Sequence, residues 1–173
     1  MNSYTVSHGG VSHHSPVYHT ICMDLTMAAE YCRVAKSRGY TVGTTNGCFY
    51  LLHPGHLALF DECKLHCNFL IVMVNTDEYI VKRKGRRPVI PFHDRMRILA
   101  SLKQVDLVVP MVEDDPREAL RTLLPSIHFN SSEYGSDCIE AEVVKGIGAE
   151  LVLVDRVKEY STTVIIESLR SQA

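Results

Sequence analysis

Apolar and polar positions along the chain fall into short blocks whose period alternates between that of a helix and that of a strand. Residues 23–38 carry apolar side chains at helical spacing, and Gly39 follows them as a C-terminal cap would. The later apolar blocks are shorter and rich in β-branched residues, which is typical of strands. They predict strands at residues 41–45, 69–75, 107–110, 126–129 and 151–154, with amphipathic helices between them at 56–67, 93–103, 116–124, 137–146 and 162–170.

This alternation predicts an α/β protein with a doubly wound, parallel sheet of about five strands. The continuously apolar run at residues 69–74 fits a strand that helices cover on both faces. Residues 1–20, rich in Ser, His and Gly, predict a flexible N-terminal arm, and residues 21–173 predict a single domain. Ligands of such sheets bind beyond the carboxyl ends of the strands, where the strand order reverses.

Composition places the 173-residue chain among globular proteins, because 46% of its residues are hydrophobic and 22% are charged. The net charge of −2 favours neither nucleic acid nor an anionic membrane as a partner. A basic segment at residues 82–97 nevertheless predicts a local anion site. The chain shows no membrane-spanning run and no signal peptide, so we expect a cytoplasmic protein whose six cysteines stay reduced.

The densest chemistry follows the first of these strands, where Asn46, Gly47, Cys48 and Phe49 lead to His53-Pro54-Gly55-His56. Proline is favoured in the first turn of a helix, where backbone N–H groups are unpaired and anions bind. Two imidazoles at that position can stabilise the charge that builds on a phosphate during displacement. The string therefore predicts phosphate chemistry at a strand-to-helix turn.

These residues resemble the signature of the cytidylyltransferase-like nucleotidyltransferase superfamily, whose hallmark is His-x-Gly-His. The order of further runs, from about residue 25 to residue 169, resembles the adenylyltransferase domain of ADP-heptose synthesis enzymes. The runs are Val74-Asn75-Thr76-Asp77, Val81-Lys82-Arg83-Lys84-Gly85, Arg87-Pro88-Val89, Asp94-Arg95, Ile98-Leu99-Ala100, Val105-Asp106 and Tyr160-Ser161-Thr162-Thr163. The resemblance implies a Rossmann-like fold, a homodimer, and transfer of AMP from ATP to a phosphorylated sugar such as heptose 1-phosphate.

The resemblance also implies a role for each matched residue. His53, His56 and Lys82 would be catalytic; Asn46, Gly47, Cys48, Phe49, Gly55, Arg156, Tyr160, Ser161, Thr162 and Thr163 would bind the nucleotide; Tyr50, Asp77 and Arg95 would bind the acceptor; and Asn130, Ser131, Ser132 and Glu133 would form a loop around the base and ribose. Structural alternatives exist for some of them. Asp77 could cap the next helix, Ser161 or Thr162 could cap the last one, and the basic residues 82–87 could be a solvated face.

The mechanism that follows needs no general base, since an acceptor phosphate is already an anionic nucleophile at neutral pH. Its oxygen would attack the α-phosphorus in line, and pyrophosphate would leave. Mg²⁺ is the expected cofactor, held mainly by the nucleotide rather than by protein ligands.

Three departures from the family pattern bear on the substrates. Tyr50 stands where relatives usually carry Asp, and Asn130-Ser131-Ser132-Glu133 stands where they carry Lys-Gly-Gly-Asp. Arg156 matches glycerol-3-phosphate cytidylyltransferases better than the heptose pattern. A CTP-dependent enzyme acting on glycerol 3-phosphate or another phosphomonoester is therefore the first alternative. A non-catalytic nucleotide-binding module is the second, and nucleic-acid binding through residues 82–87 ranks last.

Overall fold

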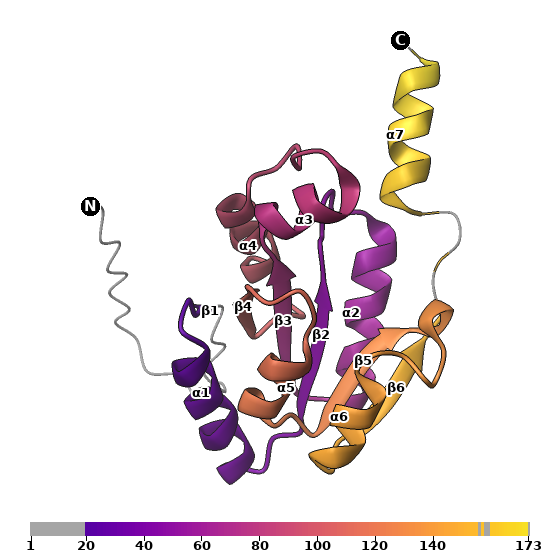
Figure 1. Ribbon diagram of the computed structural model, residues 1–173. Helices are drawn as coiled ribbons and strands as arrows, with labels where there is room; N and C mark the ends of the chain where they lie inside the picture. The colour runs from indigo at the N-terminus through magenta and orange to yellow at the C-terminus, as the bar shows by residue number, and fades with distance from the viewer. Residues whose placement is uncertain (1–19, 156, 158–159, 173) are drawn as a thin grey trace, which may run out of the picture.

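The structure is a computed structural model that describes residues 20–155, 157 and 160–172 (Figure 1). Within these residues, six parallel strands form one sheet in the order β1-β4-β3-β2-β5-β6. The strands are Thr20–Ile21 (β1), Val42–Gly47 (β2), Phe69–Asn75 (β3), Leu107–Met111 (β4), Ile127–Ser131 (β5) and Glu150–Val154 (β6). The predicted α/β class and parallel sheet are confirmed, and all five predicted strands are present.

The sixth strand, β1, was not predicted because only two residues form it. Thr20 pairs with Leu107 and Ile21 pairs with Val108, at the outer edge of the sheet. Two residues are too few to show an apolar period in the sequence. Apart from Thr20, the predicted N-terminal arm lies outside the described residues.

The helices are α1 (Leu25–Ser37), α2 (Pro54–His66), α3 (Asp77–Lys84), α4 (Phe92–Ala100), α5 (Arg117–Leu123), α6 (Ala141–Gly146) and α7 (Thr162–Ser171), with a 3-10 turn at Ser132–Tyr134. Helix α3 was not predicted, because it buries only Ile80 and its pattern is mostly polar. Helix α6 begins four residues later than predicted, since the stretch before it, with Gly135 at a φ of 72°, forms turns. No helix among the described residues is long and apolar enough to cross a membrane.

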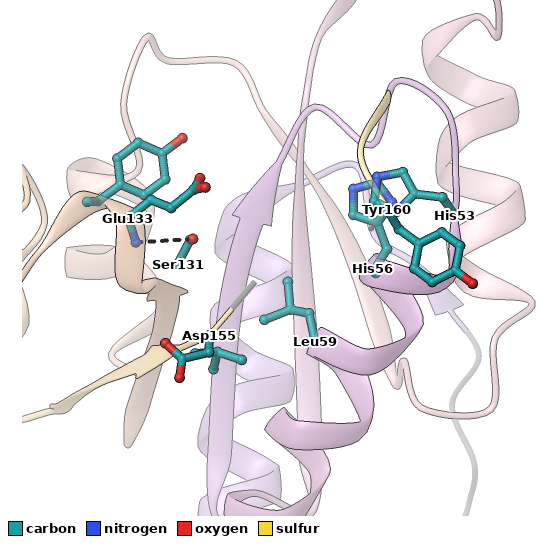
Figure 2. A pocket seen from close by; sticks show the side chains of 10 residues that line it. His53, His56, Leu59, Ser131, Glu133, Asp155 and Tyr160 are labelled. Carbon is teal, nitrogen blue, oxygen red and sulfur yellow. Dashed lines mark hydrogen bonds between the residues drawn. The ribbon is translucent and has the colours of Figure 1, made fainter. Parts of the chain in front are cut away.

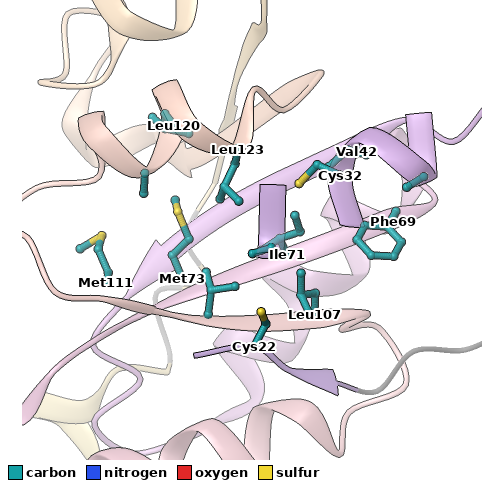
Figure 3. Close-up of a cluster of buried hydrophobic side chains, with 14 of the residues drawn as sticks. Cys22, Cys32, Val42, Phe69, Ile71, Met73, Leu107, Met111, Leu120 and Leu123 are labelled. Carbon is teal, nitrogen blue, oxygen red and sulfur yellow. The ribbon is translucent and has the colours of Figure 1, made fainter. Parts of the chain in front are cut away.

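The sheet is covered on both faces, as predicted for a doubly wound fold. Helices α1, α5 and α6 pack on one face, where Cys32, Leu120 and Val144 belong to the same buried cluster as Ile71 and Met73 of β3. Figure 3 shows Cys32 and Leu120 beside these β3 residues. Helices α2 and α4 pack on the other face, against a second buried cluster. Helix α7 buries none of its residues, and Figure 1 shows it standing clear of the sheet.

The strand order reverses beside β2. The chain passes from β2 outward to β3 and β4, and then returns to place β5 on the other side of β2. Gly43, Thr44 and Thr45 of β2 pair with Ile127, His128 and Phe129 of β5. The carboxyl ends of β2 and β5 therefore flank the crevice in which ligands of such folds bind.

Capping interactions define both ends of α1, the helix that precedes β2. The Asp24 carboxylate accepts hydrogen bonds from the backbone N–H groups of Thr26 (2.7 Å) and Met27 (3.1 Å), which satisfies two donors at the start of α1. Gly39 follows the end of the helix with a φ of 83°, a conformation that side chains disfavour. The predicted cap at Gly39 is thus confirmed.

A buried histidine lies at the junction of β2 and β5. His128 is fully buried, and its Nδ1 lies 2.9 Å from the Thr44 hydroxyl. Desolvation lowers the pKa of His128 from 6.5 to about 4. The imidazole is therefore neutral in the folded protein at physiological pH.

We expect this histidine to make the protein sensitive to acid. Above pH 6.5 it is neutral in both the folded and unfolded states, and between pH 6.5 and 4 only the unfolded state takes up the proton. The free energy of unfolding should fall by about 3 kcal/mol across this window because of His128 alone. Urea denaturation of His128→Gln should show a correspondingly shallower pH dependence. The exposed His93→Gln should keep the wild-type slope, and equal slopes for all three proteins would contradict the assignment.

Candidate active site

Two neighbouring cavities open at the carboxyl edge of the sheet, where the topology predicts ligand binding. The histidine cavity, of about 170 Å³, is lined by His53, Gly55, His56, Leu59, Ser131, Glu133, Tyr134, Val154, Asp155 and Tyr160 (Figure 2). The amide cavity, of about 570 Å³, is lined by Asn46, Gly47, Cys48, Asn75, Tyr79, Arg83, Met111, Asp114, Asp115, Pro116, Asn130, Tyr134, Cys138, Ile139 and Glu140. Tyr134 lines both cavities, so they adjoin one another.

The histidine pair sits at the first turn of α2. The rings of His53 and His56 stack with centroids 3.8 Å apart and an angle of 23° between their planes. His53 is the residue just before the helix, and Pro54 occupies the first turn, as predicted. Figure 2 shows both rings with Tyr160 on one side of the cavity and Ser131 and Glu133 on the opposite side.

Close packing explains the glycine between the two histidines. A Cβ at Gly55 would lie 3.1 Å from ring atoms of His53 and 3.2 Å from the carbonyl oxygen of Tyr160. The His56 ring also packs against Phe49, with ring centroids 5.1 Å apart. The centroid of the Phe49 ring lies 5.6 Å from that of Phe60 in the core. The histidines are therefore held in place by neighbours from the β2–α2 turn and from the segment that leads to α7.

The start of α7 reaches the same cavity through Tyr160. The Ser161 hydroxyl accepts a hydrogen bond from the Val164 backbone N–H (3.1 Å), so Ser161 caps the helix. Thr162 and Thr163 form its first turn. Backbone N–H groups at the start of a helix attract anions, and two helices, α2 and α7, therefore begin at or beside the histidine cavity. Arg156 lies outside the described residues.

The loop after β5 divides its residues between the two cavities. Asn130 lines the amide cavity, where its Nδ2 donates to the buried Glu140 carboxylate (3.2 Å). Ser131 and Glu133 line the histidine cavity, and the Ser131 hydroxyl accepts from the Glu133 N–H (3.4 Å). Ser132 starts the 3-10 turn and lines neither cavity.

Arg95, predicted to bind the acceptor, is buried beneath the cavities and lines neither of them. Its guanidinium donates to the carbonyl oxygens of Ile90 (3.2 Å), Cys48 and Asn75 (2.9 Å) and to the Asp77 carboxylate (2.7 Å). One side chain thus joins the ends of β2 and β3 to helices α3 and α4.

Asp77, also predicted to bind the acceptor, turns toward Arg95 rather than into either cavity. Its second carboxylate oxygen accepts from the Phe92 backbone N–H (3.1 Å) at the start of α4. Thr76, not Asp77, caps α3, because its hydroxyl accepts from the Tyr79 N–H (3.2 Å). Asp77 and Arg95 therefore bind each other and the backbone around the site, and neither of them lines a cavity.

Tyr50 anchors the basic segment that follows α3. It is 4% exposed, and its hydroxyl donates to the Arg87 carbonyl oxygen (3.0 Å). The Lys84 ammonium and the Arg86 guanidinium lie 5.6 and 5.5 Å from the ring centroid, within the range of cation–π attraction. Like Arg95, Tyr50 lines neither cavity.

Two basic residues of α3, Lys82 and Arg83, contact the amide cavity or a residue that lines it. Lys82 is exposed and forms an ion pair with Asp114, while Arg83 lines the cavity itself. Burial raises the pKa of the Cys48 thiol, and the nearby cations Lys84, Arg95 and Arg83 offset only part of that effect. Cys48 is therefore a neutral thiol at physiological pH. All six cysteines are free, as predicted.

Comparison with known proteins assigns the family. The family model described as Cytidylyltransferase-like matches residues 44–168, which is most of the chain and includes both cavities. The chain belongs to the Cytidylyltransferase-like family.

The most similar relatives include two larger proteins, and the chain spans about a third of the length of each. It is 41% identical over 146 residues to the Bifunctional protein HldE of Gluconacetobacter diazotrophicus. The matched region covers 83% of this chain and 30% of that protein. It is 38% identical over 167 residues to the Bifunctional protein HldE of Mesorhizobium japonicum, covering 95% and 33%. The predicted family resemblance is confirmed.

Solved structures share the fold. The lipopolysaccharide core biosynthesis protein of Thermoplasma volcanium matches with a TM-score of 0.56 and 26% identity, over 71% of this chain and all of that one. Pantothenate synthetase of Thermus thermophilus matches with a TM-score of 0.63 and 17% identity, over 88% of this chain and 70% of that one. The second likeness concerns the fold alone.

For this Cytidylyltransferase-like chain, the structure brings together His53, Gly55, His56 and Tyr160 in one cavity and Asn46, Gly47, Cys48 and Asn130 in the other. Arg83 was predicted only as part of the basic segment at residues 82–97. Other cavity residues with polar side chains were not predicted as site residues: Asn75, Tyr79, Asp114, Asp115, Tyr134, Cys138, Glu140 and Asp155. Asn75 and Asp155 each stand at or just after the end of a strand, which was the available signal. The others lie on loops and helices whose placement only the folded chain shows.

The Arg95 network leads to a test of stability. Arg95→Ala should lower the free energy of unfolding by roughly 3–5 kcal/mol, because it leaves a carboxylate and three carbonyl groups without their shared donor. Arg97→Ala, an exposed change on the same helix, should cost less than about 0.5 kcal/mol. Urea denaturation of both variants measures the difference, and similar losses would show that the buried network contributes little.

Proposed function

We propose that this chain is a nucleotidyltransferase that moves AMP from ATP to heptose 1-phosphate and releases pyrophosphate. The observation that carries the proposal is the stacked His53–His56 pair at the start of α2, in a cavity that the start of α7 also reaches. Helix starts and imidazole N–H groups together suit a triphosphate. Membership of the Cytidylyltransferase-like family and the two HldE relatives support this reaction.

In the proposed reaction, the acceptor phosphate oxygen forms a bond to the α-phosphorus as the bond to pyrophosphate breaks. His53 and His56 donate hydrogen bonds to α-phosphate oxygens, whose negative charge is best stabilised in the transition state. Ser161, Thr162 and Thr163 at the start of α7 would hold the β- and γ-phosphates with backbone N–H groups and hydroxyls. Lys82 and Arg83 would draw the second anion, the acceptor phosphate, toward the site.

The residues of the histidine cavity fit a Mg²⁺ ion that is held mainly by the nucleotide. Glu133 and Asp155 line this cavity, and carboxylate oxygens are ligands that Mg²⁺ prefers. Among the described residues, no group of three His, Cys, Asp or Glu side chains could hold a metal without the nucleotide. The ion, when bound, would neutralise part of the charge on the triphosphate.

We also propose that the protein works in the cytoplasm as a homodimer. Val164 and Leu169 of α7 are 46% and 61% exposed, so this helix has apolar surface available for a second subunit. Sedimentation equilibrium measures the mass directly, and a single species of 19.5 kDa at micromolar concentration would contradict the dimer.

The decisive test is pyrophosphate release with each of ATP, CTP, GTP and UTP against heptose 1-phosphate, glycerol 3-phosphate and other phosphomonoesters in Mg²⁺. We expect the highest turnover with ATP and heptose 1-phosphate. A maximum with CTP and glycerol 3-phosphate would favour the cytidylyltransferase alternative. Nucleotide binding without turnover for any pair would favour a non-catalytic module.

The histidine pair gives the matching variant test. His56→Ala should lower kcat by about 100- to 1000-fold, because it removes a donor to the developing charge. His66→Ala changes a half-exposed histidine at the far end of the same helix and should leave kcat unchanged. Steady-state pyrophosphate release measures both, and an active His56→Ala variant would refute the catalytic role.

A further inference from the structure

The amide cavity has a chemistry that the proposed phosphate transfer does not itself explain. Three asparagines stand at the carboxyl ends of three adjacent strands, Asn75 on β3, Asn46 on β2 and Asn130 on β5. Side chains alternate between the faces of a strand. Asn46 and Asn75 each lie an even number of residues from a member of the buried cluster on the α1 face, and Asn130 directly follows Phe129, which belongs to the cluster on the opposite face. All three amides therefore belong to the same face of the sheet, and all three line the cavity.

Two of these amides have buried polar atoms without a protein partner. Asn75 is 3% exposed, and its Oδ1 accepts from the Cys48 thiol (Sγ to Oδ1, 3.7 Å), while its Nδ2 has no hydrogen-bond partner in the described part of the chain. The Oδ1 of Asn46 is likewise buried and without a partner there. Leaving such a group unpaired costs about 1–3 kcal/mol, so a donor and an acceptor in one cavity indicate a ligand that pairs with both.

A hydroxyl group is the ligand chemistry that fits, because it donates and accepts at once. The carboxylates of Asp114, Asp115 and Glu140 line the same cavity and can only accept hydrogen bonds when ionised. Asp115 is ionised at neutral pH, since its hydrogen bonds from Arg117 (2.9 Å) lower its pKa. Several acceptors beside one free amide donor match a molecule that carries several hydroxyl groups.

The charge of the lining also opposes a phosphate deep in this cavity. Among the described lining residues, three carboxylates stand beside one cation, Arg83, while Lys82 pairs with Asp114 and Arg117 pairs with Asp115. Arg83 is therefore the one cation in the described lining that could pair with an anionic group, so most of the wall offers such a group no partner. The favourable place for the acceptor phosphate is toward the adjoining histidine cavity, where the imidazoles and the start of α2 supply donors.

We propose that the amide cavity binds the hydroxyl groups of a sugar phosphate, with Asn75 Nδ2 and Asn46 Oδ1 as the donor and acceptor that recognise them. The sugar enters hydroxyls first, and its phosphate stays outside, facing the histidine cavity. This inference rests on the proposed function, because it gives the acceptor of that reaction its binding site. A volume of about 570 Å³ lies within the usual range for small-molecule sites.

The inference makes Asn75 and Asn46 specificity-determining residues. Glycerol 3-phosphate has only two hydroxyl groups, so it would pair with fewer of the acceptors that line the cavity and should bind more weakly. A sugar with a second phosphate or a carboxylate at its far end would meet Asp114, Asp115 and Glu140 and would be rejected.

The test is calorimetric binding of heptose 1-phosphate, mannose 1-phosphate, glycerol 3-phosphate and ATP to the wild type and two variants. Asn75→Leu removes both polar atoms at similar volume, and Asn75→Asp replaces the donor with an acceptor. We expect both variants to weaken binding of the tightest sugar phosphate by 10-fold or more and to change ATP binding by less than 2-fold. The matched control is Asn68→Ala, an exposed change just before the opposite end of β3, which should keep wild-type affinities.

Thermal unfolding of each variant shows whether it folds. If Asn75→Leu does not fold, Asn75→Asp, which is closer to asparagine in shape, still tests the inference. Loss of ATP binding in place of sugar phosphate binding would overturn the inference, since the cavity would then hold the nucleotide. Unchanged affinities, or no binding of either sugar phosphate to the wild type, would overturn it as well. Sugar phosphate binding that depends on Asn75 without turnover would refute the proposed reaction and leave this site standing.

Discussion

The structure around both cavities depends on one buried cation. The guanidinium of Arg95 is 1% exposed, so each of its N–H groups needs an acceptor from the protein. It finds them at the ends of β2 and β3, on α3, and in the loop before α4. Because these acceptors are backbone carbonyls and one carboxylate, their satisfaction fixes backbone positions. Cys48 and Asn75, whose carbonyls it binds, both line the amide cavity, so Arg95 shapes a binding surface that it does not touch.

The two cavities are complementary in their electrostatics. The histidine cavity combines imidazoles and helix starts, which attract anions, with the carboxylates of Glu133 and Asp155, which would face a Mg²⁺ ion held by the nucleotide. The amide cavity is lined by carboxylates and amides, which favour hydroxyl groups. Joined at Tyr134, they offer adjacent places for a polyphosphate and for a neutral polyol. A molecule with a phosphate at one end and hydroxyl groups along the rest would meet each surface with the matching part.

Local patterns allowed the sheet and the histidine turn to be predicted, while the support of the site needed the folded chain. The predicted bounds of the strand Phe69–Asn75 match the structure, because every residue in it is buried and the apolar run is continuous. The histidine turn was predictable because His53 and His56 lie close in sequence as well as in space. Asp77 and Arg95 were read as acceptor ligands, since a sequence cannot tell a charge that faces a cavity from one buried beneath it. Glu140 was missed because its partner, Asn130, lies across a loop and a 3-10 turn.

Tyr50 shows how a change in residue type can keep a structural task while altering charge. The family pattern has an Asp at this position, and a carboxylate there could pair with the neighbouring basic segment. Tyr50 holds it by a hydrogen bond to the Arg87 carbonyl and by its ring face beneath Lys84 and Arg86. A ring attracts these cations without cancelling their charge. The basic segment at Lys84 and Arg86 therefore keeps more of its positive charge than it would beside a carboxylate.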